Sequence, residues 1–130
     1  MSFERFLVPG KFVDSDHPAV IEFATLHSGS GRSDVEKALS LYYAIRDGIR
    51  YNPYIDARSS TAYRASDAIV TGEGWCVPKA AVMVACLRVN GIPARPGYAD
   101  VKNHLASQRL LDLLGTDLFP WHSYCEAYLD

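Results

Sequence analysis

One cysteine in this sequence has surroundings that suit a nucleophile. Cys76 follows two glycines and a tryptophan and opens an apolar run over residues 77–89. Pro78 is compatible with a first helical turn, and Gly91 supplies a left-handed stop after the run. We therefore predict a helix over residues 76–89 with Cys76 at its N-terminus. Unpaired backbone N–H groups and the helix dipole there favour the thiolate, which is the reactive form.

The predicted helix behind Cys76 is apolar on nearly all sides, because only Lys79 and Arg88 interrupt the run. Such a helix belongs in the middle of a fold and would hold Cys76 rigidly. The alternative is that Cys76 is a small core residue, as cysteines in apolar surroundings commonly are. A histidine partner elsewhere in the chain favours the chemical interpretation.

The segment over residues 121–129 contains that candidate partner, His122. Its aromatic content and its period of two predict a strand. One face of this strand comprises His122, Tyr124, Glu126 and Tyr128, and the other comprises Ser123, Cys125, Ala127 and Leu129. The side chains of the second face are small and apolar, so we expect that face to be buried. A central strand rarely ends a domain without a partner hairpin, so we expect a truncated chain.

Other elements must hold these two residues in position. Ser33 and Glu36 form a capping-box pattern, which predicts a helix that ends before Pro53. A short helix is expected over residues 66–70, with Ser66 as its cap. The inward stripe of the first helix would be Val35, Ala38, Leu39, Tyr42, Ile45 and Ile49.

The elements after the central helix are a strand and a further helix. Residues 92–98 are predicted to be extended, and Pro93 and Pro96 confine them to a sheet edge or a strand start. Residues 103–114 are expected to form a helix that Gly115 stops.

The first 32 residues have weaker patterns. Residues 3–8 and 12–13 suggest extended pieces, and a short helix is expected to begin near Asp16. A flexible connector is predicted over residues 28–31.

The totals for the whole chain exclude several classes of protein. A length of 130 residues suits one domain, and 48% hydrophobic with 22% charged residues is typical of a globular protein. The net charge of −2 gives no basic excess for nucleic acid, and no segment resembles a secretory leader or a membrane span. Three cysteines without close pairing favour reduced thiols over disulfides or zinc. We therefore expect a cytoplasmic protein with no metal or cofactor, and the oligomeric state stays open.

Three short motifs follow one another along the chain. They are Gly74-Trp75-Cys76 at the start of the apolar helix, Gly91-Ile92-Pro93-Ala94-Arg95 after it, and the strand His122 to Leu129. In this order and spacing they resemble the transglutaminase-like superfamily of papain-type cysteine enzymes. The resemblance covers about residue 35 to the C-terminus. It implies an α+β fold with a papain/transglutaminase-like core, in which a nucleophile-bearing central helix packs on an antiparallel sheet. The core would span residues 33–130, incomplete at its C-terminus, after an extension over residues 1–32.

The resemblance also assigns roles. Cys76 matches the family nucleophile and His122 the family base. The usual third member, an aspartate on the next strand, has no counterpart, because Asp130 comes too soon. Glu126 shares a face with His122 but lies four residues away, roughly 13 Å along a strand. We therefore assign no orienting acid.

The implied activity is thiol-dependent acyl transfer on peptide or protein amides, as in a cysteine peptidase, an amidase or a transglutaminase. Cys76 would form a thioester with His122 as acid and base. The oxyanion would be held by the Cys76 backbone N–H and by a second donor, with the backbone or indole N–H of Trp75 as the candidate. The alternative is a catalytically inactive domain of the same family that binds peptides or a partner domain.

Four more residues are candidates for the substrate cleft, and each has a structural alternative. Arg95 could contact substrate, or it could brace a carboxylate or a helix end. Tyr98 and Tyr124 could line the cleft or serve only in packing. His104 could approach the cleft or act in a loop or cap. The expected partner is a peptide or protein substrate, not nucleic acid or a membrane.

Overall fold

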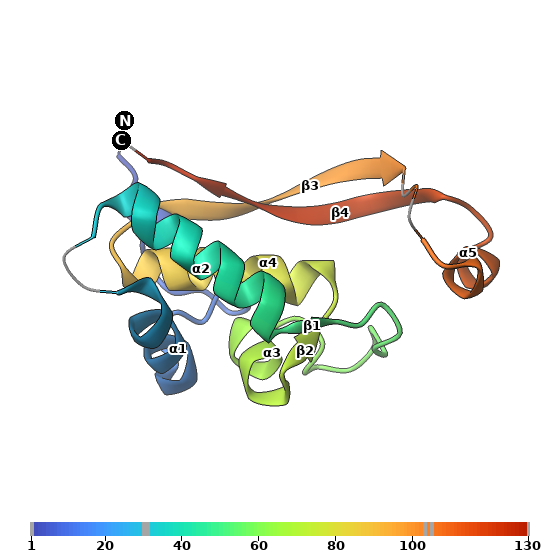
Figure 1. The fold of residues 1–130 in the computed structure, drawn as a ribbon, viewed down its shortest axis with the longest axis horizontal. Coiled ribbons are helices and arrows are strands. Elements are labelled where there is room, and N and C mark those ends of the chain that lie inside the picture. Colours follow the sequence, from blue (N-terminus) through green and yellow to red (C-terminus); the bar gives the residue numbers. More distant parts are fainter. Residues whose placement is uncertain (1, 30–31, 103, 105, 130) are drawn as a thin grey trace.

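Helix α4 (Cys76–Val89) runs through the middle of the molecule, and the other large elements pack around it. The computed structural model describes residues 2–29, 32–102, 104 and 106–129. Figure 1 shows the long β3–β4 ribbon along one side of α4, α1 and α3 on the other side, and α2 crossing in front of α4. In chain order the elements are η1 (a 3-10 helix, Glu4–Phe6), α1 (Pro18–Ser28), α2 (Asp34–Gly48), β1 (Arg50–Tyr51), α3 (Ala65–Thr71), β2 (Glu73–Gly74), α4, β3 (Ala94–Lys102), α5 (Gln108–Leu114) and β4 (Leu118–Ala127).

The core is built on α4, as its nearly continuous apolar run predicts. Eight of its residues are buried, and Val82, Val84 and Leu87 are fully removed from solvent. Burying each of these side chains stabilises the fold by about 1.5–3 kcal/mol relative to leaving it exposed. The helix ends as expected, since Gly91 takes a left-handed φ of 74° just beyond it. The prediction of a central helix over residues 76–89 is confirmed.

The capping box of α2 is also confirmed, but its predicted inward stripe is only half right: Ala38, Ile45 and Ile49 are buried as expected. The Ser33 hydroxyl accepts a hydrogen bond from the Glu36 N–H at 3.2 Å, and Glu36 reaches back to the Ser33 N–H at 3.3 Å. Leu41 is fully buried, whereas Val35, Leu39 and Tyr42 are 43–51% exposed. The buried set Ala38, Leu41, Ile45 and Ile49 keeps the same three-and-four spacing. The predicted set and the buried set both fit the helical spacing. The packing of α1 and α4 against α2 decides which of the two is buried.

The N-terminal segment contributes to the same core. The helix expected near Asp16 is present as α1, whose Val20 and Ala24 are fully buried. The extended piece predicted over residues 3–8 is wrong, because Glu4–Phe6 forms η1. The Phe6 ring of η1 stacks instead on the Tyr128 ring, just after the end of β4, with 5.6 Å between the ring centroids. The predicted connector over residues 28–31 lies partly outside the described residues.

Helix α3 begins one residue earlier than expected and is capped from a distant part of the chain. Ser66 is not the N-cap; it is buried in the first turn, and Arg64 at the N-cap position gives no side-chain cap. The Ser66 N–H donates instead to Asp14 Oδ1 at 3.1 Å, and the Ala65 N–H to the Phe12 carbonyl at 2.9 Å. A tertiary contact thus replaces the local cap that the sequence pattern predicts.

Strands β3 and β4 form an antiparallel ribbon that packs on α4. In register, Arg95 lies opposite Glu126, Gly97 opposite Tyr124 and Ala99 opposite His122, with an irregularity just after Ala99. The two predicted strands are confirmed, although both extend further toward the tip of the ribbon than expected.

The face of β4 that was expected to be buried is buried only in its middle. Ser123 is buried and Cys125 packs against the core, as predicted. Ala127 and Leu129 are exposed, because Ala127 is the last paired residue of β4 and Leu129 lies beyond the ladder.

Helix α5 forms between the two strands, at the far end of the ribbon (Figure 1). It begins at Gln108 rather than at 103, because the Ser107 hydroxyl caps it by accepting from the Leu110 N–H at 3.2 Å. Gly115 stops it with a φ of 71°, as expected. Asn103 and Leu105, in the predicted first turn, lie outside the described residues. Within the described part of the chain, no helix combines the length and apolar character needed to cross a membrane.

Candidate active site

Cys76 is the first residue of α4, directly after the short strand β2. Strand β2 pairs in parallel with β1, and the Asn52 N–H donates to the Gly74 carbonyl at 2.9 Å. A Cβ added at Gly74 would come within 3.1 Å of the Pro78 side chain and 3.5 Å of that of Ala68. The backbone that leads to Cys76 is therefore packed too closely for any other residue to fit without adjustment.

Trp75 anchors the residue before the cysteine. Its indole N–H donates to the Ala62 carbonyl at 2.7 Å, and its ring meets the edge of the Tyr63 ring at 5.4 Å. The indole is one of the two oxyanion donors suggested at Trp75, and this hydrogen bond already commits it. The backbone N–H is the remaining candidate at that residue.

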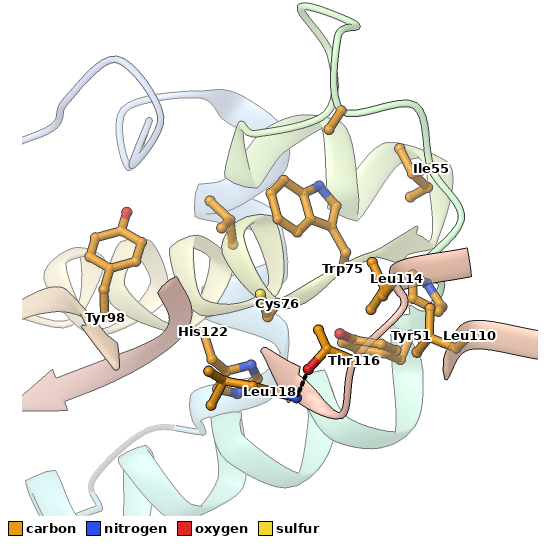
Figure 2. A pocket seen from close by; sticks show the side chains of 13 residues that line it. Tyr51, Ile55, Trp75, Cys76, Tyr98, Leu110, Leu114, Thr116, Leu118 and His122 are labelled. Atoms are coloured by element: carbon orange, nitrogen blue, oxygen red, sulfur yellow. Dashed lines mark hydrogen bonds between the residues drawn. The ribbon is translucent and has the colours of Figure 1, made fainter. Parts of the chain in front are cut away.

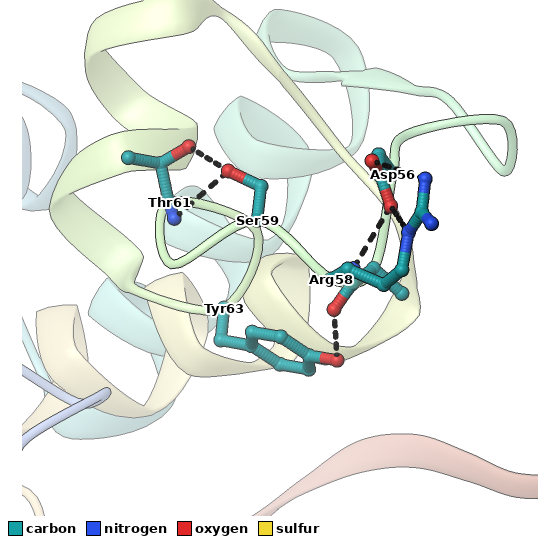
Figure 3. Close-up of polar contacts among 6 residues, drawn as sticks. Asp56, Arg58, Ser59, Thr61 and Tyr63 are labelled. Atoms are coloured by element: carbon teal, nitrogen blue, oxygen red, sulfur yellow. Dashed lines mark hydrogen bonds and ion pairs between the residues drawn. The ribbon is translucent and has the colours of Figure 1, made fainter.

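The loop that supplies the Ala62 carbonyl is held by its own polar contacts (Figure 3). Arg58 pairs with Asp56 at 3.0 Å, and the Tyr63 hydroxyl donates to the Ala57 carbonyl at 2.6 Å. The Ser59 and Thr61 hydroxyls lie 2.9 Å apart. These contacts order the segment that faces the start of α4.

Cys76 and His122 line the same cleft. Both contribute to a cavity of about 740 Å³, which we call the wide arm, and to one of about 280 Å³, which we call the narrow arm. Figure 2 shows the cysteine at the end of α4 and the histidine on β4 turned toward the same space. Both residues are half-buried. The fold therefore brings together the two residues that sequence analysis selected for chemistry.

The two arms differ in composition. The wide arm is lined by Tyr51, Pro53, Ile55, Ala57, Trp75, Cys76, Val77, Tyr98, Leu110, Leu114, Thr116, Leu118 and His122. The narrow arm is lined by Tyr42, Ile45, Arg46, Tyr51, Cys76, Lys79, Ala80, Met83, His122, Ser123, Tyr124 and Cys125. The wide arm is mostly aliphatic and aromatic, whereas the narrow arm includes two cationic side chains.

The Ser123 hydroxyl is a buried polar group in the wall of the narrow arm. It is buried, and among the described residues it has no hydrogen-bond partner. Lys79 also lines the narrow arm, and its ammonium group donates to the Ile49 carbonyl. Burial lowers the pKa of that ammonium group.

Two of the four predicted cleft residues line the cleft and two do not. Tyr98 lies in the wall of the wide arm and Tyr124 in that of the narrow arm. Arg95 instead pairs with Glu126 at 2.6 Å and lies over the Phe6 ring, so its carboxylate-bracing alternative holds. His104 is exposed in the turn between β3 and α5 and lines neither arm.

Sequence analysis did not select the residues that form most of the wide arm. Tyr51 lines both arms, and burial, with a smaller contribution from Cys76, raises the pKa of its phenol. Leu110, Leu114 and Leu118 come from the tip of the ribbon. Their apolar character was visible in the sequence, but only the fold reveals that they face Cys76.

Burial and ion pairing shift the pKa values of other groups in the core and on the ribbon. Burial raises the pKa of the Cys86 thiol to about 12. The pKa of the Cys125 thiol is also raised to about 12, with burial as the main cause. The Arg95 guanidinium lowers the pKa of Glu126 through their hydrogen bond. Glu126 is therefore paired elsewhere, in agreement with leaving it out of a triad. Among the described residues, no group of three or more His, Cys, Asp or Glu side chains could hold a metal ion.

Comparison with known proteins identifies the family. Residues 22–130 match the model of the transglutaminase-like superfamily, and the chain belongs to that superfamily. Its fold is similar to the crystal structure of a candidate cysteine protease from Cytophaga hutchinsonii, with a TM-score of 0.69 and 25% sequence identity. The match covers 95% of this chain and 37% of that one, so this chain spans little more than a third of its structural relative. No curated protein matches it significantly. The predicted α+β, papain-like core is confirmed.

Proposed function

We propose that this protein catalyses thiol-dependent acyl transfer on peptide or protein amides, with Cys76 as nucleophile and His122 as acid and base. The observation that carries the proposal is that both side chains line the two arms of a single cleft. Membership of the transglutaminase-like superfamily supports it. The similarity to a candidate cysteine protease is in line with it.

The position of Cys76 supports its role as the attacking group. At the first residue of α4 its sulfur lies near the positive end of a 14-residue helix. Backbone N–H groups of the first turn have no partner within the helix, and together with the dipole they favour a negative charge on sulfur. The same N–H groups could stabilise an oxyanion on the attacked carbonyl, with the Trp75 backbone N–H as second donor.

The reaction would proceed in two steps. The Cys76 sulfur attacks the amide carbonyl carbon, and the C–N bond breaks while protonated His122 gives its proton to the departing amine. Neutral His122 then takes a proton from water or from an acceptor amine, which attacks the thioester and releases Cys76. Hydrolysis gives peptidase or amidase activity, and attack by an amine gives transglutaminase activity.

The competing proposal is an inactive domain that uses the cleft for binding. It is favoured by the pairing of Glu126 with Arg95, which removes the nearest acid of the same strand from a role beside His122. If the protein is instead an enzyme, it would use Cys76 and His122 as a pair, without Glu126 as a third catalytic group. The reactivity of Cys76 distinguishes the two proposals.

The test is the rate of alkylation of each thiol by iodoacetamide, followed by peptide mass spectrometry. We expect Cys76 to react much faster than Cys86 and Cys125. His122→Ala should slow the reaction of Cys76, whereas His104→Ala, which removes an exposed histidine outside both arms, should not. Equal, slow alkylation of all three thiols would contradict the proposed activity and favour the binding domain.

A further inference from the structure

We infer that the wide arm is a specificity pocket for a bulky apolar side chain of the substrate, with helix α5 and the start of β4 as its selective wall. This inference rests on the proposed function, because it assigns a ligand group to the same cleft. It adds the chemical class of the substrate and the residues that select it.

Three separate segments enclose the wide arm (Figure 2). The loop after β1 supplies Pro53, Ile55 and Ala57, and the start of α4 supplies residues 75–77. The tip of the ribbon supplies Leu110, Leu114 and Leu118. A volume of about 740 Å³ lies within the range of about 300–1,000 Å³ that is typical of small-molecule sites. The space is large enough for an aromatic side chain with its flanking backbone.

The polar atoms of the wide arm offer little to a charged group. Its lining includes no Lys, Arg, Asp or Glu among the described residues. The Trp75 indole N–H is bound to the Ala62 carbonyl, and the Thr116 hydroxyl accepts from the Leu118 N–H at 3.1 Å. A charged substituent away from Cys76 and His122 would lose its hydration there without meeting an oppositely charged side chain, which is costly. The narrow arm, with Arg46 and Lys79 in its wall, is the less suitable arm for an apolar group.

The leucines of the wall leave apolar surface uncovered. Leu114 is 48% and Leu118 49% exposed, although both line the arm, and Leu110 beside them is buried. A bound apolar side chain would cover this surface at a gain of roughly 25 cal/mol for each Å² removed from water. Leu113 is 67% exposed and does not line the arm. Neighbouring leucines of one helix therefore differ in whether they face the proposed ligand.

Contacts across the mouth of the arm position α5. The Tyr54 hydroxyl lies 3.3 Å from the Ser107 hydroxyl, which also caps α5. The Arg109 guanidinium lies over the Tyr54 ring at 4.1 Å. These contacts join the tip of the ribbon to the loop on the opposite side of the cleft, so the wall is held against the space it encloses.

The test compares two alkylating reagents that differ only in an apolar group. N-(2-phenylethyl)iodoacetamide should alkylate Cys76 roughly tenfold or more faster than iodoacetamide, after correction for their rates with glutathione. In Leu114→Asp this ratio should fall toward one, because the charge faces the phenyl group. Leu114→Trp, which fills the arm without a charge, should lower it as well. The matched control Leu113→Asp should keep the wild-type ratio.

The outcomes separate this inference from the proposed function. A wild-type ratio near one, or a ratio that both Leu114 variants leave unchanged, would overturn the specificity pocket. If iodoacetamide shows that Cys76 is unactivated while the phenylethyl reagent still favours it, the pocket stands and the catalytic proposal fails. Circular dichroism of each variant checks that its fold is retained.

Discussion

The two sides of the cleft are built differently. On the helical side, Cys76 begins a buried helix and the preceding backbone at Gly74 is in close contact with Pro78 and Ala68. On the ribbon side, His122 lies on a two-stranded ladder whose tip carries half-exposed leucines and a seven-residue helix. The difference suggests a division of roles, in which the helical side supplies stability and a fixed position for the proposed nucleophile, and the ribbon side supplies the proposed selectivity.

The largest expected contrast lies between leucines of the two sides. Leu87→Ala should lower the free energy of unfolding by about 2–5 kcal/mol, because it leaves a cavity in place of a fully buried side chain. Leu118→Ala should lower it by less than about 1 kcal/mol, because half of that side chain is already exposed. Urea unfolding followed by tryptophan fluorescence measures both values. Similar losses for the two variants would remove the distinction between the sides.

A smaller loss of stability is expected when Gly74, two residues before Cys76, is changed. Gly74→Ala should cost about 1–3 kcal/mol, because the new Cβ would contact the Pro78 side chain at 3.1 Å. It should also slow alkylation of Cys76 by shifting the start of α4. Gly48→Ala is the control, since no atom lies within 4 Å of its added Cβ. Gly48 is the exposed last residue of α2, so this control should change the stability by less than about 0.5 kcal/mol. An unchanged alkylation rate in Gly74→Ala would argue against a tightly held nucleophile.

The smallest effect is expected from the ion pair on the ribbon. Arg95 lowers the pKa of Glu126 in the folded state, so the pair stabilises the protein above the unfolded-state pKa of about 4.3. This contribution is lost as the pH falls through the lower, folded-state pKa. The stability difference between the wild type and Glu126→Gln should therefore be small at pH 7 and shrink toward zero in acid, as measured by urea unfolding at each pH.

The same variant tests whether the ribbon pair belongs to the cleft. Because Arg95 and Glu126 lie outside both arms, Glu126→Gln should leave the pH profile of Cys76 alkylation unchanged. A shifted profile would mean that Glu126 acts on His122 after all.

Features that depend on neighbouring residues were predicted well from the sequence. The capping box at Ser33, the span of α4, and the stops at Gly91 and Gly115 each follow from the chemistry of a few adjacent groups. The failures were of another kind. The burial of Leu41 in place of Leu39 and Tyr42 on α2, and the cap of α3 by Asp14, depend on which distant segment lies alongside. The sequence left two roles open for Arg95, and the fold selects its pairing with Glu126.

The sequence by itself therefore determined the helix that carries Cys76, the strand that carries His122, and the family to which both belong. A backbone turn, a cap and a hydrophobic period are local, so residue types can specify them without knowledge of the fold. Only the tertiary structure decided that Leu114 and Leu118 enclose the space beside Cys76, while Arg95 turns away from it. Those relationships arise when packing brings separated segments together, and no short stretch of sequence contains that information.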